Sequence, residues 1–220
     1  MQIIVRSSMK YALLILLMII LCSGVSFDQK DCKLKIEKDS IKIYLCSLDN
    51  SRFKAVRSIF YVNGGLSDLA AIVLDIDHYN EWQYKTVSVE ILKKISDQEI
   101  IYYTEVAAPI LTDNRDFVIH LTVNQNPGTR EMIIDLVSLP DYIPPKEDVI
   151  RVPYSKARWT VKSLSPKKLA VDYYIEIDLG GSVPAWLVNM VAHEAPYETF
   201  KDLREKIGRY KNSNVPFIQD

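Results

Sequence analysis

Residues 180–207 read GGSVPAWLVNMVAHEAPYETFKDLREKI, and this stretch decides the fold of the chain. Its large side chains recur every three or four residues, the spacing of one face of an α-helix. They are Trp186, Met190, His193, Tyr197, Phe200, Leu203 and Ile207. Pro184 suits a helix start, whereas Pro196 must kink or restart the helix because it has no N–H. The pattern predicts a long C-terminal helix with one apolar face.

The chain before this helix alternates strand-like segments with one shorter helix. Ser67 suits the N-cap of a helix over residues 68–76, whose apolar residues also recur at spacings of three and four. Strands are predicted at residues 53–62, 87–96, 99–107, 116–124, 131–138, 157–163 and 168–177. The proline-bearing connection 139–151 is predicted to be a long exposed loop. Together these elements predict one α+β domain, an antiparallel sheet with the C-terminal helix across it.

The composition is that of a folded globular chain. Of the 220 residues, 48% are hydrophobic and 25% are charged, close to the averages of soluble domains. These values exclude an intrinsically disordered chain and a disulfide-dense miniprotein. The 27 basic and 28 acidic residues nearly cancel, so no strong positive field favours nucleic acid as a partner.

The N-terminus has the pattern of a secretory signal peptide. An apolar run at residues 11–21 follows two basic residues and precedes small residues that suit cleavage after Ser26. We therefore expect residues 1–26 to be removed and residues 27–220 to form an exported domain, periplasmic or secreted. The alternatives are a lipoprotein, modified at Cys22, and an uncleaved anchor.

Two cysteines remain after the expected cleavage. They bound the segment 32–46, CKLKIEKDSIKIYLC, which reads as two alternating strands around a turn centred on Asp39. That centre places Cys32 opposite Cys46, and cross-strand neighbours lie within reach of a disulfide. We expect a structural disulfide, since an exported chain permits one; the alternative is two unpaired thiols.

Three motifs resemble the START domain, the steroidogenic-acute-regulatory-protein-related lipid-transfer family. They are Asp77–Trp82 (DHYNEW), Asp113–Val118 (DNRDFV) and Asp178–Asn189 (DLGGSVPAWLVN). The resemblance runs from Cys32 to Ile207. It implies a helix-grip fold, in which a curved antiparallel sheet wraps around the C-terminal helix and encloses an apolar cavity. It also implies a monomer that binds one lipid-like molecule without a cofactor and touches membranes transiently.

The second motif supplies the main candidate for a ligand contact. Arg115 and Asp116 are adjacent on a predicted strand, so their side chains point to opposite faces. The resemblance makes Arg115 a candidate for the ligand head group; the alternative is a structural arginine in a salt bridge. Glu105, on the preceding strand, is a candidate either for the partner of Arg115 or for a bond to a ligand hydroxyl.

Four further residues are candidates for the wall of the ligand site: Trp82, Trp186, Met190 and His193. The apolar bodies of the two tryptophans suit a cavity wall or the protein core, where each indole N–H needs a partner. Packing within the core is the alternative for both tryptophans and for His193.

The sequence offers little support for metal binding or for catalysis. The acidic cluster at residues 75–81 has no pair of histidines at metal-ligand spacing, so no metal is expected. No nucleophile motif accompanies the histidines. The alternative function is an enzyme of the cyclase or aromatase type, with Glu105, Arg115 and His193 as acid–base groups. A third alternative is a partner-binding domain with a filled core.

Overall fold

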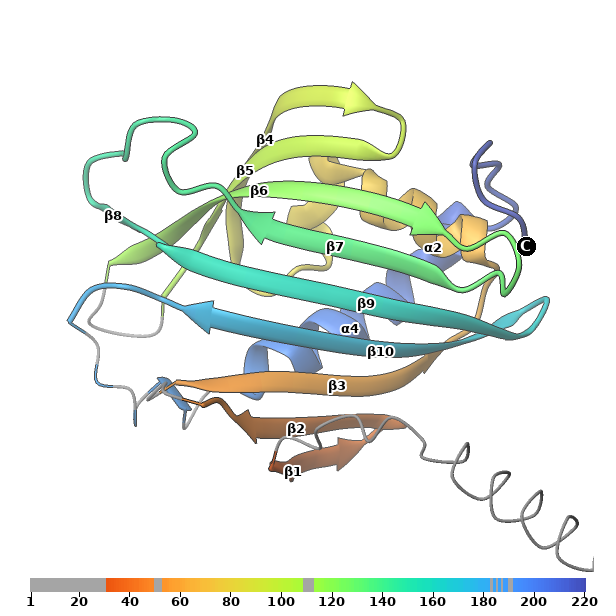
Figure 1. Ribbon diagram of the computed structural model, residues 1–220, viewed down its shortest axis with the longest axis horizontal. Coiled ribbons are helices and arrows are strands. Elements are labelled where there is room, and N and C mark those ends of the chain that lie inside the picture. The colour runs from red at the N-terminus through yellow and green to blue at the C-terminus, as the bar shows by residue number, and fades with distance from the viewer. Residues whose placement is uncertain are drawn as a thin grey trace, which may run out of the picture. The chain divides into compact units, whose positions relative to one another are not determined.

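A ten-stranded sheet forms the frame of the protein in a computed structural model (Figure 1). The structure describes residues 31–49, 53–108, 113–182, 184, 186, 188, 189 and 192–220. The strands are β1 (Cys32–Lys38), β2 (Ile41–Ser47), β3 (Lys54–Val62), β4 (Thr86–Ser96), β5 (Glu99–Val106), β6 (Asn114–Gln125), β7 (Met132–Ser138), β8 (Val149–Arg151), β9 (Tyr154–Ser165) and β10 (Lys168–Asp178). Their order is β1-β2-β3-β10-β9-β7-β6-β5-β4, with antiparallel neighbours; β8 pairs with β6 in parallel.

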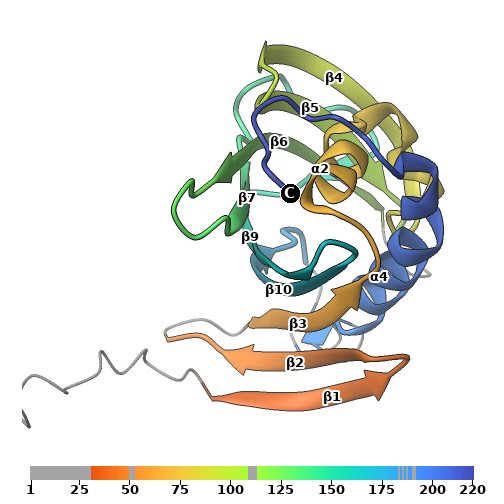
Figure 2. The ribbon, with the colours of Figure 1, turned by 90° about the vertical axis from the view of Figure 1, so that its right-hand side faces the viewer.

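Helices occupy the concave side of the curved sheet (Figure 2). They are α2 (Leu66–Leu74), the 3-10 helix η1 (Ile76–Glu81), α4 (Glu194–Lys206) and the 3-10 helix η2 (Ile207–Tyr210). Both α-helices turn an apolar stripe toward the sheet, which in α4 consists of Tyr197, Phe200 and Leu203. The arrangement confirms the predicted α+β helix-grip fold.

An aromatic cluster fixes α4 to the sheet. Phe200 stacks on Phe60 of β3 with ring centroids 4.2 Å apart. Its ring also meets Trp159 and Tyr173 edge-on, at 5.3 and 5.0 Å. Because buried aromatic side chains contribute large apolar areas and preferred edge-to-face contacts, this cluster fills the space directly under α4.

Both predicted helices differ from the observed ones at their starts. The N-cap of α2 is Gly65 and not Ser67, because the Asp68 side chain accepts the Gly65 N–H at 3.0 Å. The C-terminal helix restarts at Glu194, so α4 is shorter than the predicted helix. Pro196 stands in the first turn of α4, where its missing N–H removes no helical bond.

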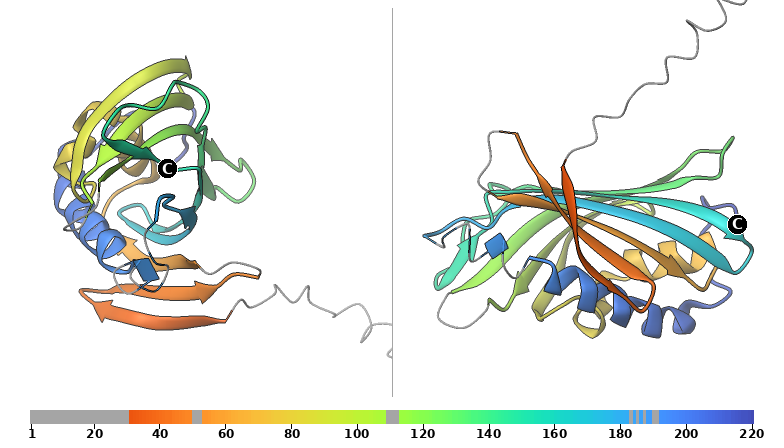
Figure 3. Two further views of the ribbon diagram at one scale, coloured as in Figure 1. Left: turned by 90° about the vertical axis from the view of Figure 1, so that its left-hand side faces the viewer. Right: turned by 90° about the horizontal axis from the view of Figure 1, so that it is seen from below.

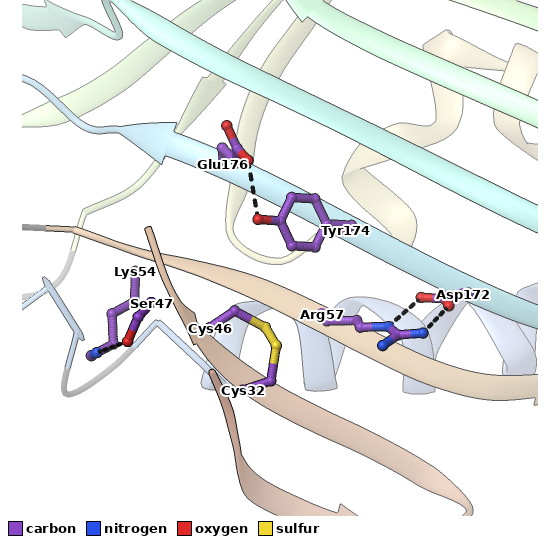
Figure 4. Close-up of a disulfide and its surroundings, with 8 residues drawn as sticks. All are labelled: Cys32, Cys46, Ser47, Lys54, Arg57, Asp172, Tyr174 and Glu176. Atoms are coloured by element: carbon purple, nitrogen blue, oxygen red, sulfur yellow. Dashed lines mark hydrogen bonds and ion pairs between the residues drawn. A yellow bond between two sulfur atoms is a disulfide. The ribbon is translucent and has the colours of Figure 1, made fainter. Parts of the chain in front are cut away.

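The β1–β2 hairpin has the expected disulfide, Cys32–Cys46, and a different turn (Figure 4). Asp39 and Ser40 form a two-residue turn with φ of 51° and 59°, as in type I′ hairpins. The predicted turn centre at Asp39 would place Ile36 opposite Lys42, but Ile36 faces Ile43, a correction to the predicted register. A β-bulge between Leu34 and Ile36 restores the predicted pairing at the cysteines.

None of the helices in the described part of the chain is both long and apolar enough to span a bilayer. Residues 1–26 lie outside the described residues, so the signal peptide and the export that it implies stay predictions.

Candidate ligand-binding site

The inner face of the sheet, which the helices cover, is fully buried at one end and partly accessible at the other. The buried end includes a cross-strand row that is 0–1% exposed: Met132, Val161, Val171 and Phe60. Five inward-facing apolar side chains nearer the other end remain half-buried: Phe117, Leu136, Tyr173, Ile175 and Ile177. We call these five the inner-face patch. They lie on the same face as the buried row because side chains alternate along each strand.

Arg115 lies on the inner face, at the end of the sheet where β6 begins and β10 ends (left in Figure 1). It pairs across the strands with Val106, so both side chains point inward. Only 6% of Arg115 is exposed. Its Nη1 donates to the Asp113 carbonyl, but its Nε and Nη2 have no hydrogen-bond partner among the described residues. This burial lowers the pKa of Arg115, partly offset by the nearby Asp113 carboxylate.

Two threonines extend this polar end of the inner face. Thr86 pairs with Val106, which in turn pairs with Arg115, and Thr104 pairs with Phe117 of the inner-face patch. The Oγ1 atoms of both threonines are buried and unpartnered among the described residues. Buried polar atoms are normally hydrogen-bonded; here three side chains at one end of an apolar surface have buried polar atoms with no partner among the described residues.

The two glycines of the third motif bring the end of β10 to Arg115. Gly180 and Gly181 have φ of +64° and +66°, backbone angles that residues with a side chain rarely adopt. A Cβ on Gly181 would lie 3.5 Å from Nη2 of Arg115 and 3.0 Å from Ile150. The close approach explains the Gly-Gly pair, which lets the backbone pass beside the guanidinium.

Glu105, the predicted acidic partner of Arg115, lies on the opposite face of the sheet. Glu105 pairs across the strands with Asp116, so both point away from Arg115. Glu105 accepts a 2.6 Å bond from Asn114, and Asp116 binds Arg151 at 2.9 and 3.0 Å. Glu105 is therefore not the partner of Arg115, and Arg115 forms no salt bridge among the described residues.

Sequence reasoning missed Arg151. The signal was present, since a buried aspartate beside an inward arginine needs a cation on its own face. Nη1 of Arg151 also donates to the carbonyls of Pro140 and Ile143, at 2.6 and 3.0 Å. The connection 139–151, predicted as a simple exposed loop, is thus anchored at its base and ends in β8.

The remaining candidates do not gather at Arg115 as one group. Trp82 is 2% exposed and packs edge-on against Tyr79 at 5.0 Å, so it belongs to the core. Trp186 is 68% exposed, which contradicts its predicted packing. His193 is half-buried at the N-cap of α4, with Nδ1 unpartnered among the described residues. Met190 lies outside the described residues.

A surface groove of about 550 Å³ runs between α4, β1 and the chain after η1. Its lining includes Ile36 and Trp82, and from α4 the residues Glu194, Tyr197, Glu198 and Asp202. Arg115 and the inner-face patch do not line it. The groove flanks α4 and is distinct from the candidate site.

Two acidic residues of the cluster at residues 75–81 form polar pairs with basic side chains at the surface. His78 lies 2.9 Å from Asp75, which raises the pKa of His78, and Arg209 binds Glu81. Across the described ranges, no group of three His, Cys, Asp or Glu side chains could hold a metal ion.

Relatives of this chain with known sequences include bacterial and mammalian proteins. An uncharacterised protein of Pseudomonas aeruginosa is 31% identical over 176 residues, 80% of this chain and 86% of the relative. The phosphatidylcholine transfer protein of Mus musculus is 29% identical over 187 residues, 82% of this chain and 85% of the relative.

Solved structures share the fold. A fragment of the STAR-related lipid transfer protein of Xanthomonas axonopodis matches with a TM-score of 0.75 and 27% identity, over 80% of this chain and 98% of that one. The human StAR-related lipid transfer protein 5 matches in fold, with a TM-score of 0.69 and 17% identity, over 93% of this chain and 97% of that one. The START domain model matches residues 25–213. The chain therefore belongs to the START domain family.

Proposed function

We propose that this protein binds one phospholipid-like molecule without transforming it, and carries it between membranes. The phosphate lies against Arg115, and the acyl chains lie along the inner-face patch. The observation that carries the proposal is the buried guanidinium of Arg115, whose Nε and Nη2 have no partner among the described residues.

An anion is the ligand group that Arg115 favours. Holding a guanidinium away from water is unfavourable when its only nearby negative charge, the Asp113 carboxylate, forms no ion pair with it among the described residues. A phosphate accepts two parallel bonds from a guanidinium fork, whereas a neutral hydroxyl offers less. Both threonine hydroxyls, at Thr86 and Thr104, can bond to the same head group, since each is buried and unpartnered among the described residues.

The inner-face patch supplies the apolar part of the binding energy. Its five side chains are half-buried on the concave side of the sheet. Acyl methylenes that cover such a surface gain about 0.8 kcal/mol each when they leave water. A ligand with long chains and a small charged head therefore fits the order of groups along this face.

A carrier is favoured over an enzyme by the separation of the acid–base groups. Glu105 points to the face opposite Arg115, so the two are not placed to act on one substrate. The mouse relative named for phosphatidylcholine transfer aligns over most of both chains, which supports the same ligand class here.

Native mass spectrometry of the full chain, followed by lipid extraction, tests the proposal. We expect one phospholipid per protein. In Arg115→Met the bound phospholipid should be lost, while the free energy of unfolding of the ligand-free protein should fall by no more than about 1 kcal/mol, because only the bond to the Asp113 carbonyl is lost and no ion pair is broken.

The matched control is Arg158→Met, because Arg158 forms an exposed pair with Asp135 on the outer face at 2.7 Å. This variant should keep the lipid. A wild-type protein that carries no lipid, or an Arg115→Met protein that retains phospholipid fully, would overturn the proposal.

The same proposal places the protein outside the cytoplasm, on the signal-peptide pattern of residues 1–26. N-terminal sequencing of the mature protein tests this, with Phe27 as the expected first residue. An intact N-terminus in the cytoplasmic fraction would exclude export.

A further inference from the structure

The turn of the β1–β2 hairpin holds α4 (Figure 3). The hydroxyl of Tyr197 donates to Oδ2 of Asp39 at 2.6 Å, and Nη1 of Arg204 donates to the Asp39 carbonyl at 2.7 Å. Nζ of Lys38 lies 5.7 Å from the centroid of the Tyr197 ring. The first and last turns of α4 are thus bonded to the turn between β1 and β2 at the edge of the sheet.

β1 has little else to keep it in place. It contributes no residue to the buried core cluster; Leu34 is 46% exposed, and Ile36 is only half-buried. The neighbouring β2 buries Ile41, Ile43 and Leu45. The edge strand is therefore held by its backbone bonds to β2 and by the disulfide at the open end of the hairpin (Figure 4).

A groove runs along α4 beside the hairpin. This groove of about 550 Å³ is lined by Ile36 of β1, by Tyr197 and Glu198 of α4, and by the chain after η1. A bond of 3.1 Å from the Tyr84 N–H to Thr199 Oγ1 crosses between the two sides. Apart from this bond, the groove leaves the side of α4 that bears Glu194, Glu198 and Asp202 without close packing.

We propose that the β1–β2 hairpin is a redox-sensitive latch on α4. With the disulfide closed, the hairpin is rigid and its turn holds α4 through Tyr197 and Arg204. With the disulfide open, β1 frays, the turn at Asp39 loses its fixed geometry, and α4 is released. The rest of the sheet stays folded because β1 adds only the half-buried Ile36 to its core.

The chemistry is a two-electron thiol–disulfide exchange with a dithiol reductant. A thiolate of the reductant attacks Sγ of Cys32, which is half-buried, whereas Cys46 is fully buried. The Cys46 thiolate leaves and takes a proton from water. The second thiol of the reductant then displaces Cys32, so the protein gains two thiols and the reductant becomes a disulfide.

Hydrogen–deuterium exchange of the full chain, oxidised and then reduced with dithiothreitol, tests the latch. We expect amides of α4 (Glu194–Lys206) to exchange about tenfold faster after reduction. A change of this size corresponds to the loss of roughly one to two hydrogen bonds. Peptides from β6, β7 and β9 should not change. The Cys32→Ser/Cys46→Ser variant should behave as the reduced protein, with or without dithiothreitol.

Two variants distinguish a specific effect of the hairpin on α4 from a general stabilisation of the whole fold by the disulfide. Tyr197→Phe removes only the donor to Asp39, and in the oxidised chain it should speed exchange in α4 alone. Asp172→Asn, which removes the outer-face pair with Arg57, should leave α4 protected. Unchanged α4 exchange on reduction, uniform acceleration of all peptides, or a Tyr197→Phe chain identical to the wild type would overturn the proposal.

The latch can be tested without lipid, so its failure is separable from that of the proposed function. Where the proposed function holds as well, the reduced chain should transfer phospholipid between vesicles faster than the oxidised chain. Retention of lipid in native mass spectra reports on the carrier proposal alone.

Discussion

Arg151 and Asp116 form a buried, two-pronged ion pair across β8 and β6. The two bonds measure 2.9 and 3.0 Å, and the side chains are 8% and 0% exposed. The same guanidinium binds carbonyls of the connection 139–151. One arginine thus neutralises a buried carboxylate and closes the loop that covers it.

Arg151→Met should therefore destabilise the protein strongly. It leaves the Asp116 carboxylate buried without a counter-charge, which costs about 3–5 kcal/mol. Urea unfolding followed by circular dichroism measures this loss. The exposed pair of Arg158 and Asp135 is the comparison, and Arg158→Met should cost less than about 1 kcal/mol. Equal losses in the two variants would contradict the role assigned to burial.

Gly180→Ala should cost about 1–2 kcal/mol, because the residue has φ of +64° and the new Cβ would lie 3.0 Å from Cδ of Pro153. Gly208→Ala is the matched control, since a Cβ there meets no atom within 4 Å. Thermal unfolding of both variants checks the difference. A Gly180→Ala protein as stable as Gly208→Ala would show that the turn relaxes freely.

Phe200→Ala should destabilise the protein by about 3–5 kcal/mol, since it removes the ring that stacks on Phe60 and leaves a cavity under α4. Leu164→Ala is the control, because Leu164 is largely exposed in β9. Denaturant titration of both variants gives the comparison. A small loss in Phe200→Ala would mean that α4 is held mainly by its polar contacts.

His78 should titrate above the ordinary histidine pKa, because Asp75 accepts a hydrogen bond from it and attracts its charge. A raised folded-state pKa means that this stabilising contribution is complete below the ordinary value, about 6.5. The contribution is lost as the pH rises through the folded value. NMR titration of the imidazole checks the direction, and Asp75→Asn should return the pKa of His78 toward the ordinary value. A pKa of His78 that is the same in both proteins would exclude Asp75 as the cause.

The local pattern of side chains predicted most elements and the hairpin disulfide. The spacing of Tyr197, Phe200 and Leu203 is set by helix geometry within a few residues, so it can be read without the rest of the chain. The pairing of Cys32 with Cys46 needs only one short turn, and even there the two-residue turn shifted the register near it until a β-bulge restored the predicted pairing.

The partners of the charged groups depended on the tertiary structure. Alternation along a strand separates Arg115 from Asp116, but the pairing of β5 with β6 decided that Glu105 shares the face of Asp116. Arg151 reaches Asp116 from 35 residues away through β8. Such contacts follow from the register between distant strands and from how the loops cover the sheet, and neither is encoded in a short run of residues.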